Sequence, residues 1–414
     1  MKKPKKNYWE ERSRMSNIPK LRFPEFSGEW EEKKLSDIMT RLTRKNLNNE
    51  SSRALTISSV DGLIDQGEFF KKQIASKDTS GYYLLKKGDF AYNKSYSVGY
   101  DYGSIKRLDR YEDGVVSTLY ICMSLTSDTN SDYLTHYFDS MKWNKSVSEI
   151  SAEGARNHGL LNIPTEAFFQ TKHYLAPSLP EQQKIADFLS NVDSIITAET
   201  KILNSLQKKK KALMQKLFTQ QLRFKSDDGK DFPEWEERKL GEFCKTYSGG
   251  TPKSGTADYY GGEIPFIRSG EISSNKTELF LTEKGMENSS AKMVSKGDIL
   301  YALYGANSGL CSISKIDGAI NQAILCIKTK ENKRFLCNYL QYQREYFYST
   351  YLQGGQGNLS GKLVESFIIP LPCIVEQQKI ADCLSSIDSL IQTQQKVITT
   401  WQQRKKALLQ QMFI

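Results

Sequence analysis

Residues 181–187 read EQQKIAD, and residues 376–382 read EQQKIAD again, 195 positions later. The similarity continues at the same offset, because KKALMQKLF from Lys210 recurs as KKALLQQMF from Lys405. Seven identical residues in a row do not arise by chance, and an internal repeat of this kind determines the architecture before any single motif is considered. The sequence therefore predicts two copies of one long segment.

A second pair of repeats precedes two globular blocks. LRF at residues 21–23 recurs at residues 222–224, and WEEKKL from Trp30 recurs as WEERKL from Trp235. The blocks that follow share only short matches, such as one KGD tripeptide in each, and these matches precede strand-like runs. We therefore expect two blocks with one scaffold and different loops, arranged as a pseudo-two-fold internal repeat.

The long segments have the apolar spacing of a coiled coil. Apolar residues recur at two heptad positions in both copies, which predicts two paired helices, each roughly 57 Å long at about 1.5 Å per residue. The residues expected to pair are Ile185, Leu189, Val192, Ile196, Leu203 and Leu206 in the first copy, and Ile380, Leu384, Ile387, Ile391, Ile398 and Trp401 in the second. Lys210 and Lys405 also fall on this seam, and we interpret them as its solvated ends. Packing of both helices into the core of one larger domain is the alternative, which the narrow apolar stripe disfavours.

The composition excludes several classes of protein. The chain has 414 residues, a net charge of +10 and no apolar run near ~18 residues, so it predicts a cytoplasmic protein of two or three domains without a transmembrane helix. Its seven cysteines form no C-x-x-C pair and its three histidines lack ligand spacing, so neither disulfides nor a metal site is expected. Basic residues concentrate in residues 1–14 and in the long segments, so a polyanion would bind the blocks only through an uneven charge distribution.

The sequence contains no motif for catalysis. Gly361-Lys362 is followed by Leu363, which excludes a phosphate loop of the G-x-x-x-x-G-K-[ST] type. The chain also lacks the Asn-Pro-Pro-aromatic tetrapeptide and the glycine-rich cofactor turn that methylation of a base amino group would need. We therefore expect no catalytic residue and no cofactor in this chain.

Binding chemistry remains, and it concentrates in loops punctuated by glycine. Lysine neutralises phosphate, arginine can pair with guanine, and asparagine and glutamine can pair with adenine. The residues predicted to bind DNA are Lys94, Ser95, Tyr96, Arg156, Asn157 and His158 in the first block, and Thr251, Lys253, Tyr304, Asn307, Gln356 and Asn358 in the second. Strand-edge turns with exposed tyrosines are the alternative interpretation. An aromatic stripe at helical spacing, namely Phe335, Tyr339, Tyr342 and Tyr346, is predicted to belong to a core.

With its LRF and WEE-[KR]-K-L lead-ins and its two EQQKIAD helices, the chain resembles the specificity subunit of type I restriction-modification systems from Met15 onward. The resemblance implies an α+β fold with two globular α/β target recognition domains separated by two long antiparallel coiled-coil helices. The implied parts are a disordered basic extension at 1–14, a first target recognition domain at 15–177, a first long spacer helix at 178–221, a second target recognition domain at 222–372 and a second long helix at 373–414.

The resemblance also implies that DNA recognition and catalysis belong to different subunits of one complex. In that family each variable domain recognises one half of a bipartite site in double-stranded DNA, and the paired helices hold the domains at a fixed separation. The subunit is not catalytic. It recruits two modification subunits, which methylate adenine with S-adenosylmethionine, and two restriction subunits, which translocate and cut DNA with ATP and Mg²⁺.

Two other classes of function are consistent with parts of the sequence. A structural adaptor whose two domains bind proteins is the main alternative, and the nearly neutral blocks favour it slightly. A nuclease with an unrecognised site is disfavoured, because histidines and acidic residues do not cluster in the sequence. DNA binding that weakens steeply with salt would separate the first interpretation from the adaptor.

Overall fold

The computed structural model describes residues 17–70, 76, 78–151, 161–351 and 358–414. In these parts of the chain no helix is both long enough and apolar enough to span a membrane. The chain divides into two compact units: unit 1 comprises residues 1–200 and 397–414, and unit 2 comprises residues 201–396.

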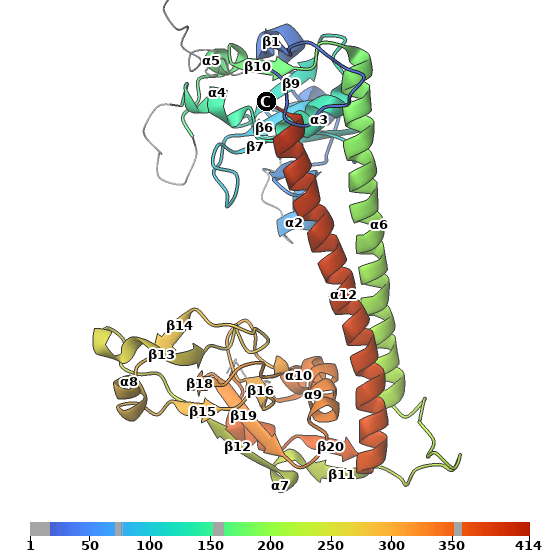
Figure 1. The fold of residues 1–414 in the computed structure, drawn as a ribbon, viewed down its shortest axis with the longest axis vertical. Helices are drawn as coiled ribbons and strands as arrows, with labels where there is room; N and C mark the ends of the chain where they lie inside the picture. The colour runs from blue at the N-terminus through green and yellow to red at the C-terminus, as the bar shows by residue number, and fades with distance from the viewer. Residues whose placement is uncertain (1–16, 71–75, 77, 152–160, 352–357) are drawn as a thin grey trace, which may run out of the picture. The chain divides into compact units, whose positions relative to one another are not determined.

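Two long helices contribute to both units (Figure 1). They are α6 (Leu179–Phe218) and α12 (Ile374–Met412). Unit 1 contains the start of α6 and the end of α12, and unit 2 contains the end of α6 and the start of α12. At the start of α6, Ser178 Oγ accepts a hydrogen bond from Glu181 N (3.4 Å), as N-cap serines do.

Unit 1 is built on a four-stranded antiparallel sheet. Its strands lie in the order β2 (Met39–Leu42), β9 (Ile121–Leu125), β6 (Phe90–Asn93) and β7 (Ser104–Arg107). Because side chains alternate along a strand, Phe90 and Tyr92 face one side of the sheet and Ala91 faces the other. The first side packs on α3 (Ser131–Asp139) and on the ends of the long helices, and the second packs on smaller strand pairs.

Shorter elements complete unit 1. The strand pairs are β1 (Glu31–Lys34) with β10 (Lys172–Leu175), β3 (Leu55–Ser58) with β4 (Gly62–Asp65), and β5 (Tyr83–Lys86) with β8 (Asp113–Val116). The helices are α1 (Leu35–Ile38), η1 (Leu47–Asn49), α2 (Gln66–Phe70), α4 (Asn144–Ser148) and α5 (Thr165–Phe169).

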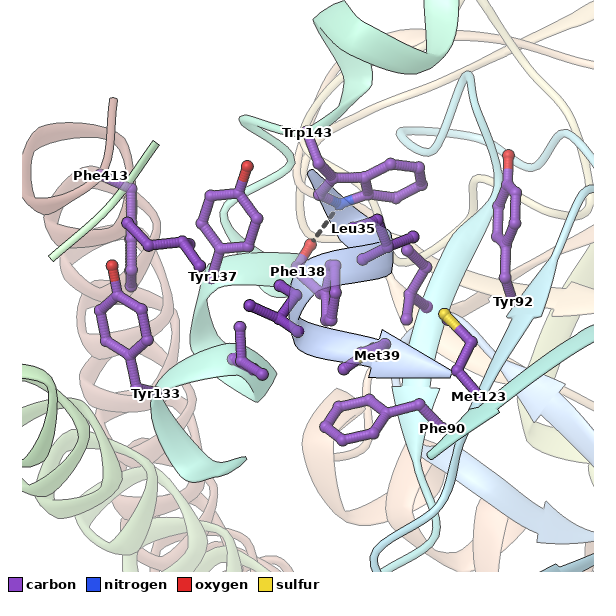
Figure 2. Close-up of a cluster of buried hydrophobic side chains, with 14 of the residues drawn as sticks. Leu35, Met39, Phe90, Tyr92, Met123, Tyr133, Tyr137, Phe138, Trp143 and Phe413 are labelled. Atoms are coloured by element: carbon purple, nitrogen blue, oxygen red, sulfur yellow. Dashed lines mark hydrogen bonds between the residues drawn. The ribbon is translucent and has the colours of Figure 1, made fainter. Parts of the chain in front are cut away.

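Aromatic rings fill the core of unit 1 (Figure 2). Trp143 Nε1 donates a hydrogen bond to the carbonyl oxygen of Phe138 (2.8 Å). The ring of Phe413, just beyond α12, lies 5.4 Å from that of Tyr133 and 5.7 Å from that of Tyr137, measured between centroids. Phe413 and the end of α12 therefore complete the core of unit 1.

Unit 2 repeats this design with a second sheet added. Its first sheet has the order β12 (Cys244–Ser248), β19 (Ile324–Thr329), β16 (Ile299–Ala302) and β17 (Cys311–Ile313). The second has the order β14 (Leu279–Leu281), β13 (Tyr260–Ile267), β18 (Gly318–Ile320) and β15 (Lys292–Val294). Ile299 and Tyr301 face the helical side of β16, whereas Leu300 and Ala302 face the second sheet.

The remaining elements of unit 2 also match those of unit 1. They are β11 (Glu236–Lys239) paired with β20 (Ile368–Leu371), and α7 (Leu240–Phe243), η2 (Ala257–Tyr259), α8 (Glu283–Glu287), α9 (Lys333–Tyr342), α10 (Arg344–Tyr351) and α11 (Gly361–Glu365). Phe218 is the repeat equivalent of Phe413, and its ring lies 5.3 Å from that of Tyr339 on α9. The prediction of two mixed α/β domains with two long helices is confirmed.

The predicted aromatic stripe is only partly a core. Phe335 and Tyr339 are buried and Tyr342 is partly buried, but Tyr346 is 57% exposed. Tyr346 lies on α10 rather than α9, because the helix breaks at Gln343. The prediction is therefore wrong for Tyr346.

The residues of the predicted helix seam differ in burial: some are buried and others are half-buried. Ile185 and Leu189 are buried in the core of unit 1, and Ile380 and Leu384 are buried in the core of unit 2. Val192 and Ile398 are also buried, while the half-buried members are Ile196, Leu203, Leu206, Ile387, Ile391 and Trp401. The outer parts of the seam therefore also belong to the cores of the two units, and not to the core of one larger domain.

Candidate nucleic-acid interface and its helical support

In unit 1 a backbone hydrogen bond joins two described residues that lie next to candidate loops. Leu161 N donates a hydrogen bond to the carbonyl oxygen of Lys94 (3.0 Å), directly after β6. The Lys94 side chain lines a small cavity with Arg41 and Thr165. Partial burial lowers the pKa of the Lys94 ammonium group. This end of the sheet therefore carries two basic side chains and the bases of two loops.

Unit 2 has the same contact at the equivalent place. Leu359 N donates a hydrogen bond to the carbonyl oxygen of Leu303 (2.9 Å), directly after β16. Lys94 and Leu303 follow their KGD tripeptides by the same number of residues in the sequence. The two bonds are therefore repeat equivalents. Asn358, a predicted DNA-binding residue, is exposed beside it.

Two predicted residues of unit 2, Thr251 and Tyr304, interact with Gln322. Thr251 Oγ1 donates a hydrogen bond to Gln322 Oε1 (2.6 Å). Burial raises the pKa of the Tyr304 phenol, and an interaction with Gln322 opposes that rise. Gln322 itself was not predicted, because it follows β18 in a segment with no glycine-rich signal.

Among the other predicted residues, Lys253 and Tyr96 are exposed, Ser95 and Asn307 are half-buried, and the rest lie outside the described residues. Lys253 is exposed, and Asn307 lies beside Gly270, where a Cβ would be 3.6 Å from Asn307 Nδ2. In unit 1, Ser95 N donates a hydrogen bond to Asn93 Oδ1 (3.0 Å), and Tyr96 is 56% exposed. The predicted residues outside the described parts of the chain are Arg156, Asn157, His158 and Gln356.

The glycine pair before Thr251 has a packing role. A Cβ on Gly249 would lie 1.8 Å from the carbonyl oxygen of Ile320, and a Cβ on Gly250 would lie 2.0 Å from Ser290 Oγ. Both distances are far shorter than any allowed contact, so these glycines permit close approach of neighbouring segments. Phosphate binding is not needed to explain them.

A groove in unit 2 extends the interface toward α6. It has a volume of about 1190 Å³, and its lining includes Lys210, Lys211, Arg344 and Tyr346. Arg344 Nε donates a hydrogen bond to the carbonyl oxygen of Ser308 (2.9 Å), in the loop between β16 and β17. Positive side chains and exposed tyrosine suit contacts with a sugar-phosphate backbone.

The EQQKIAD motif anchors each lead-in to its helix. In unit 1, Glu181 accepts hydrogen bonds from Arg22 Nε (2.7 Å) and Nη2 (2.8 Å) and from Trp30 Nε1 (3.2 Å). The Glu181 side chain is only 1% exposed. The first repeated acidic residue therefore joins the LRF and WEE lead-in motifs at one buried point.

Unit 2 contains the equivalent anchor. Glu376 accepts hydrogen bonds from Arg223 Nε (3.1 Å) and Nη2 (2.9 Å) and from Trp235 Nε1 (3.0 Å). Its side chain is fully buried. The repeated Glu, Arg and Trp thus form the same contacts twice.

The two glutamines of the motif fix the shorter helices. Gln182 Oε1 accepts a hydrogen bond from Asn130 N (2.8 Å), and Gln183 Oε1 accepts one from Asn130 Nδ2 (2.6 Å). Asn130 in turn caps α3 by accepting a hydrogen bond from Tyr133 N (2.8 Å). In unit 2 the same bonds join Gln377, Gln378 and Asn332, which caps α9.

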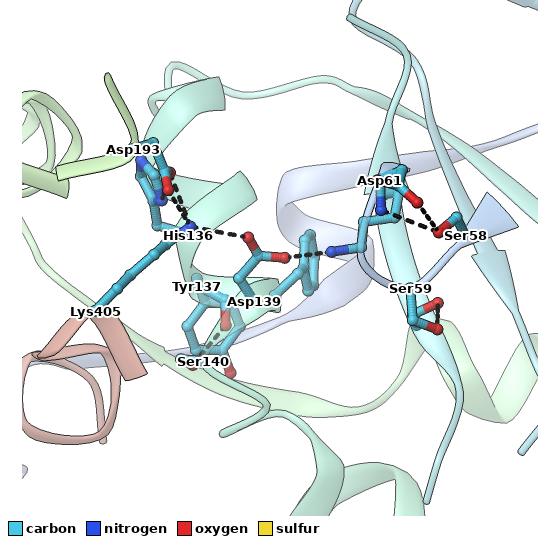
Figure 3. A network of polar contacts seen from close by, with 12 residues as sticks. Ser58, Ser59, Asp61, His136, Tyr137, Asp139, Ser140, Asp193 and Lys405 are labelled. Carbon is cyan, nitrogen blue, oxygen red and sulfur yellow. Dashed lines mark hydrogen bonds and ion pairs between the residues drawn. The ribbon is translucent and has the colours of Figure 1, made fainter. Parts of the chain in front are cut away.

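Lys210 and Lys405 form ion pairs, so their interpretation as solvated ends is wrong. Lys405 Nζ lies 2.7 Å from Asp193 Oδ1 and 3.7 Å from Asp139 Oδ2 in unit 1 (Figure 3). Lys210 Nζ lies 2.7 Å from Asp388 Oδ1 in unit 2. The Lys405–Asp193 and Lys210–Asp388 pairs each join α6 to α12, and these two pairs are repeat equivalents. In each unit the helices therefore run antiparallel with the same register.

Within the described residues, no group of three or more histidine, cysteine, aspartate or glutamate side chains is placed to hold a metal ion. Both units instead present the same arrangement: a four-stranded sheet with connections of different sequence in the two units, on a scaffold fixed to two long helices. These features define a protein with two recognition domains of one design.

The chain belongs to the family of type I restriction modification DNA specificity domains, whose model matches residues 27–208 and 233–400. A type I restriction enzyme specificity subunit of Methanocaldococcus jannaschii, MjaX, is 27% identical over 421 residues, which cover 95% of each chain. The adaptor alternative is therefore not favoured, and the role of the chain is DNA sequence specificity.

Solved structures have the same fold. The S subunit of a type I restriction-modification system from M. genitalium superimposes with a TM-score of 0.55 at 15% identity, covering 96% of this chain and 99% of the other. A chain from another type I R-M system gives a TM-score of 0.53 at 18% identity, covering 93% and 97%.

Proposed function

We propose that each unit reads one half of a bipartite DNA site and that the long helices set the spacing between the halves. The observation that carries this proposal is the repeated bond between the two loop bases, from Leu161 N to Lys94 O and from Leu359 N to Leu303 O. The same bond thus recurs beside candidate loops whose sequences differ between the two units. Such an arrangement suits two domains that recognise DNA bases in the same way but differ in which bases they recognise.

The catalytic steps belong to other subunits in this proposal. The helices dock two modification subunits, which bind S-adenosylmethionine and methylate adenine, and two restriction subunits act with ATP and Mg²⁺. The absence of catalytic motifs from the sequence supports this assignment. The exposed polar faces of α6 and α12 offer a docking surface.

Exchange of the first domain tests the proposal. Residues 39–170 are replaced with the corresponding region of a relative, and the chain is expressed with its modification subunit. Methylation sequencing should show a change in one half of the modified site while the other half is retained. A folded chimera with changes in both halves would contradict separate reading by the two units.

The spacing role is tested by lengthening both helices at equivalent positions. Four residues inserted after Lys201 and after Lys396 lengthen each helix by about 6 Å, which is close to two base pairs at ~3.4 Å each. The methylated site should gain unspecified central bases while both halves keep their sequences. Circular dichroism shows whether the helices survive, since a four-residue insertion changes the heptad phase. An active variant with the original spacer would refute the spacing role.

A further inference from the structure

Two loop tips of unit 1 expose valine side chains to solvent. Val98 is 91% exposed and Val60 is 81% exposed, the largest values among the bulky apolar residues of the described parts of the chain. Val60 lies between β3 and β4, and Val98 lies between β6 and β7. Neither valine contributes to the core, so the fold does not account for an apolar residue at either tip.

Both tips are held by local hydrogen bonds. Tyr100 N donates to Ser97 O (2.8 Å), so Val98 and Gly99 form a two-residue tip, and Gly99 has the positive φ of 82° that such a tip favours. At the other tip, Ser58 Oγ donates to Asp61 Oδ2 (2.9 Å) and accepts from Asp61 N (3.0 Å) (Figure 3). The valines therefore occupy turns that hydrogen bonds of the chain itself hold in place.

The two tips are also joined to each other. Ser59 Oγ lies 3.2 Å from Ser97 Oγ and donates a hydrogen bond to Ser104 Oγ (3.1 Å). Each valine directly follows one of the two bonded serines, Ser59 and Ser97. The tip of the second loop is continuous with Lys94, where the candidate interface begins.

We infer that Val60 and Val98 contact the C5-methyl group of thymine in the major groove of the first half-site. The inference rests on the proposed function and specifies which chemical group of the DNA bases unit 1 contacts. A valine side chain neither donates nor accepts a hydrogen bond, and the thymine methyl is the apolar feature that base pairs present in the major groove. A hairpin tip fits this groove, which is about 12 Å wide, and ordered tips lose little conformational entropy on binding.

The experiment uses the full chain with its modification subunit and a duplex that contains the methylated site found by sequencing. Each thymine of the first half-site is replaced in turn by deoxyuridine, which lacks only the C5-methyl group. Binding should weaken about 4-fold at one or two positions, which equals about 0.8 kcal/mol. Val98→Ala and Val60→Ala should weaken binding to the thymine duplex similarly, and deoxyuridine should then cause little further loss.

Controls separate this contact from general effects. Leu47→Ala removes a side chain that is 62% exposed elsewhere in unit 1 and should leave the deoxyuridine effect unchanged. Val98→Thr keeps the shape of valine but replaces one methyl group with a hydroxyl group, so it should weaken binding to the thymine duplex in a chain that retains the loop.

Two outcomes would overturn the inference while leaving the proposed function intact. One is a first half-site without thymine, and the other is a deoxyuridine effect that is equal in the wild type and both alanine variants. A wild-type complex whose DNA binding is independent of both sequence and salt would instead overturn the proposed function itself.

Discussion

Replacement of Glu181 by alanine should strongly destabilise unit 1. The substitution removes the acceptor of three hydrogen bonds and leaves the Arg22 guanidinium, whose side chain is 10% exposed, without its carboxylate. Removal of one partner from a buried ion pair costs about 3–5 kcal/mol. Arg22 keeps the carbonyl oxygens of Ser27 and Gly28 as acceptors, so we expect the lower end of this range.

Hydrogen exchange in increasing urea measures this loss for each unit separately. Peptides of α3 report on unit 1, and peptides of α9 report on unit 2. Glu181→Ala should lower the free energy of opening in the first set. Glu376→Ala, the matched substitution at the repeat equivalent, should act in the same way on the second set.

A double-mutant cycle tests the cause. If the cost of Glu181→Ala arises from the unpaired guanidinium, Arg22→Met combined with it should cost less than the two single substitutions added together, by about 0.5–3 kcal/mol. A loss below about 1 kcal/mol for Glu181→Ala, or strictly additive single effects, would refute the argument that this buried pair anchors the lead-in.

Three further predictions concern unit 1. Burial lowers the pKa of His173 to about 4, between the hydroxyl groups of Tyr137 and Thr171. The unfolded chain therefore binds this proton near pH 6.5, and stability present in full above that pH should fall by about 3 kcal/mol as pH drops to 4. Urea unfolding across this range should show a weaker pH dependence for His173→Gln. Phe413→Ala should cost about 3–5 kcal/mol in exchange of α3 and leave α9 unchanged. Lys405→Met should cost about 1 kcal/mol or less in the same assay, because its partner Asp193 is 41% exposed.

The repeat and the heptads predict the fold well because both are patterns within the sequence. The lead-ins, two blocks and two long helices follow from spacing alone. The heptad pattern does not separate a helix seam from a domain core, since both need an apolar stripe. Ile185 and Ile380 therefore lie in the domain cores, although the same pattern describes a coiled coil.

The partners of charged residues could not be predicted in the same way. Lys405 pairs with Asp193, which lies more than 200 positions earlier and outside the predicted seam. Only the antiparallel register of α6 and α12 brings these two side chains together. The same is true of Val60 and Val98, because the Ser59 contact that joins their tips depends on how β3 and β6 are placed in the fold.

The structure gives a physical reason why the long segments are alike while the loops differ. In each anchor the bonds are made by side chains of defined shape and charge, such as Glu376 with Arg223 and Trp235, so another residue type would lose them. Beside the candidate loops, by contrast, one equivalent bond in each unit joins main-chain atoms only. The same bond forms with Lys94 in unit 1 and with Leu303 in unit 2, because a carbonyl oxygen is present whatever the side chain. This bond can therefore form at the base of a loop whatever the side chains there, as a protein that must read different DNA sequences requires.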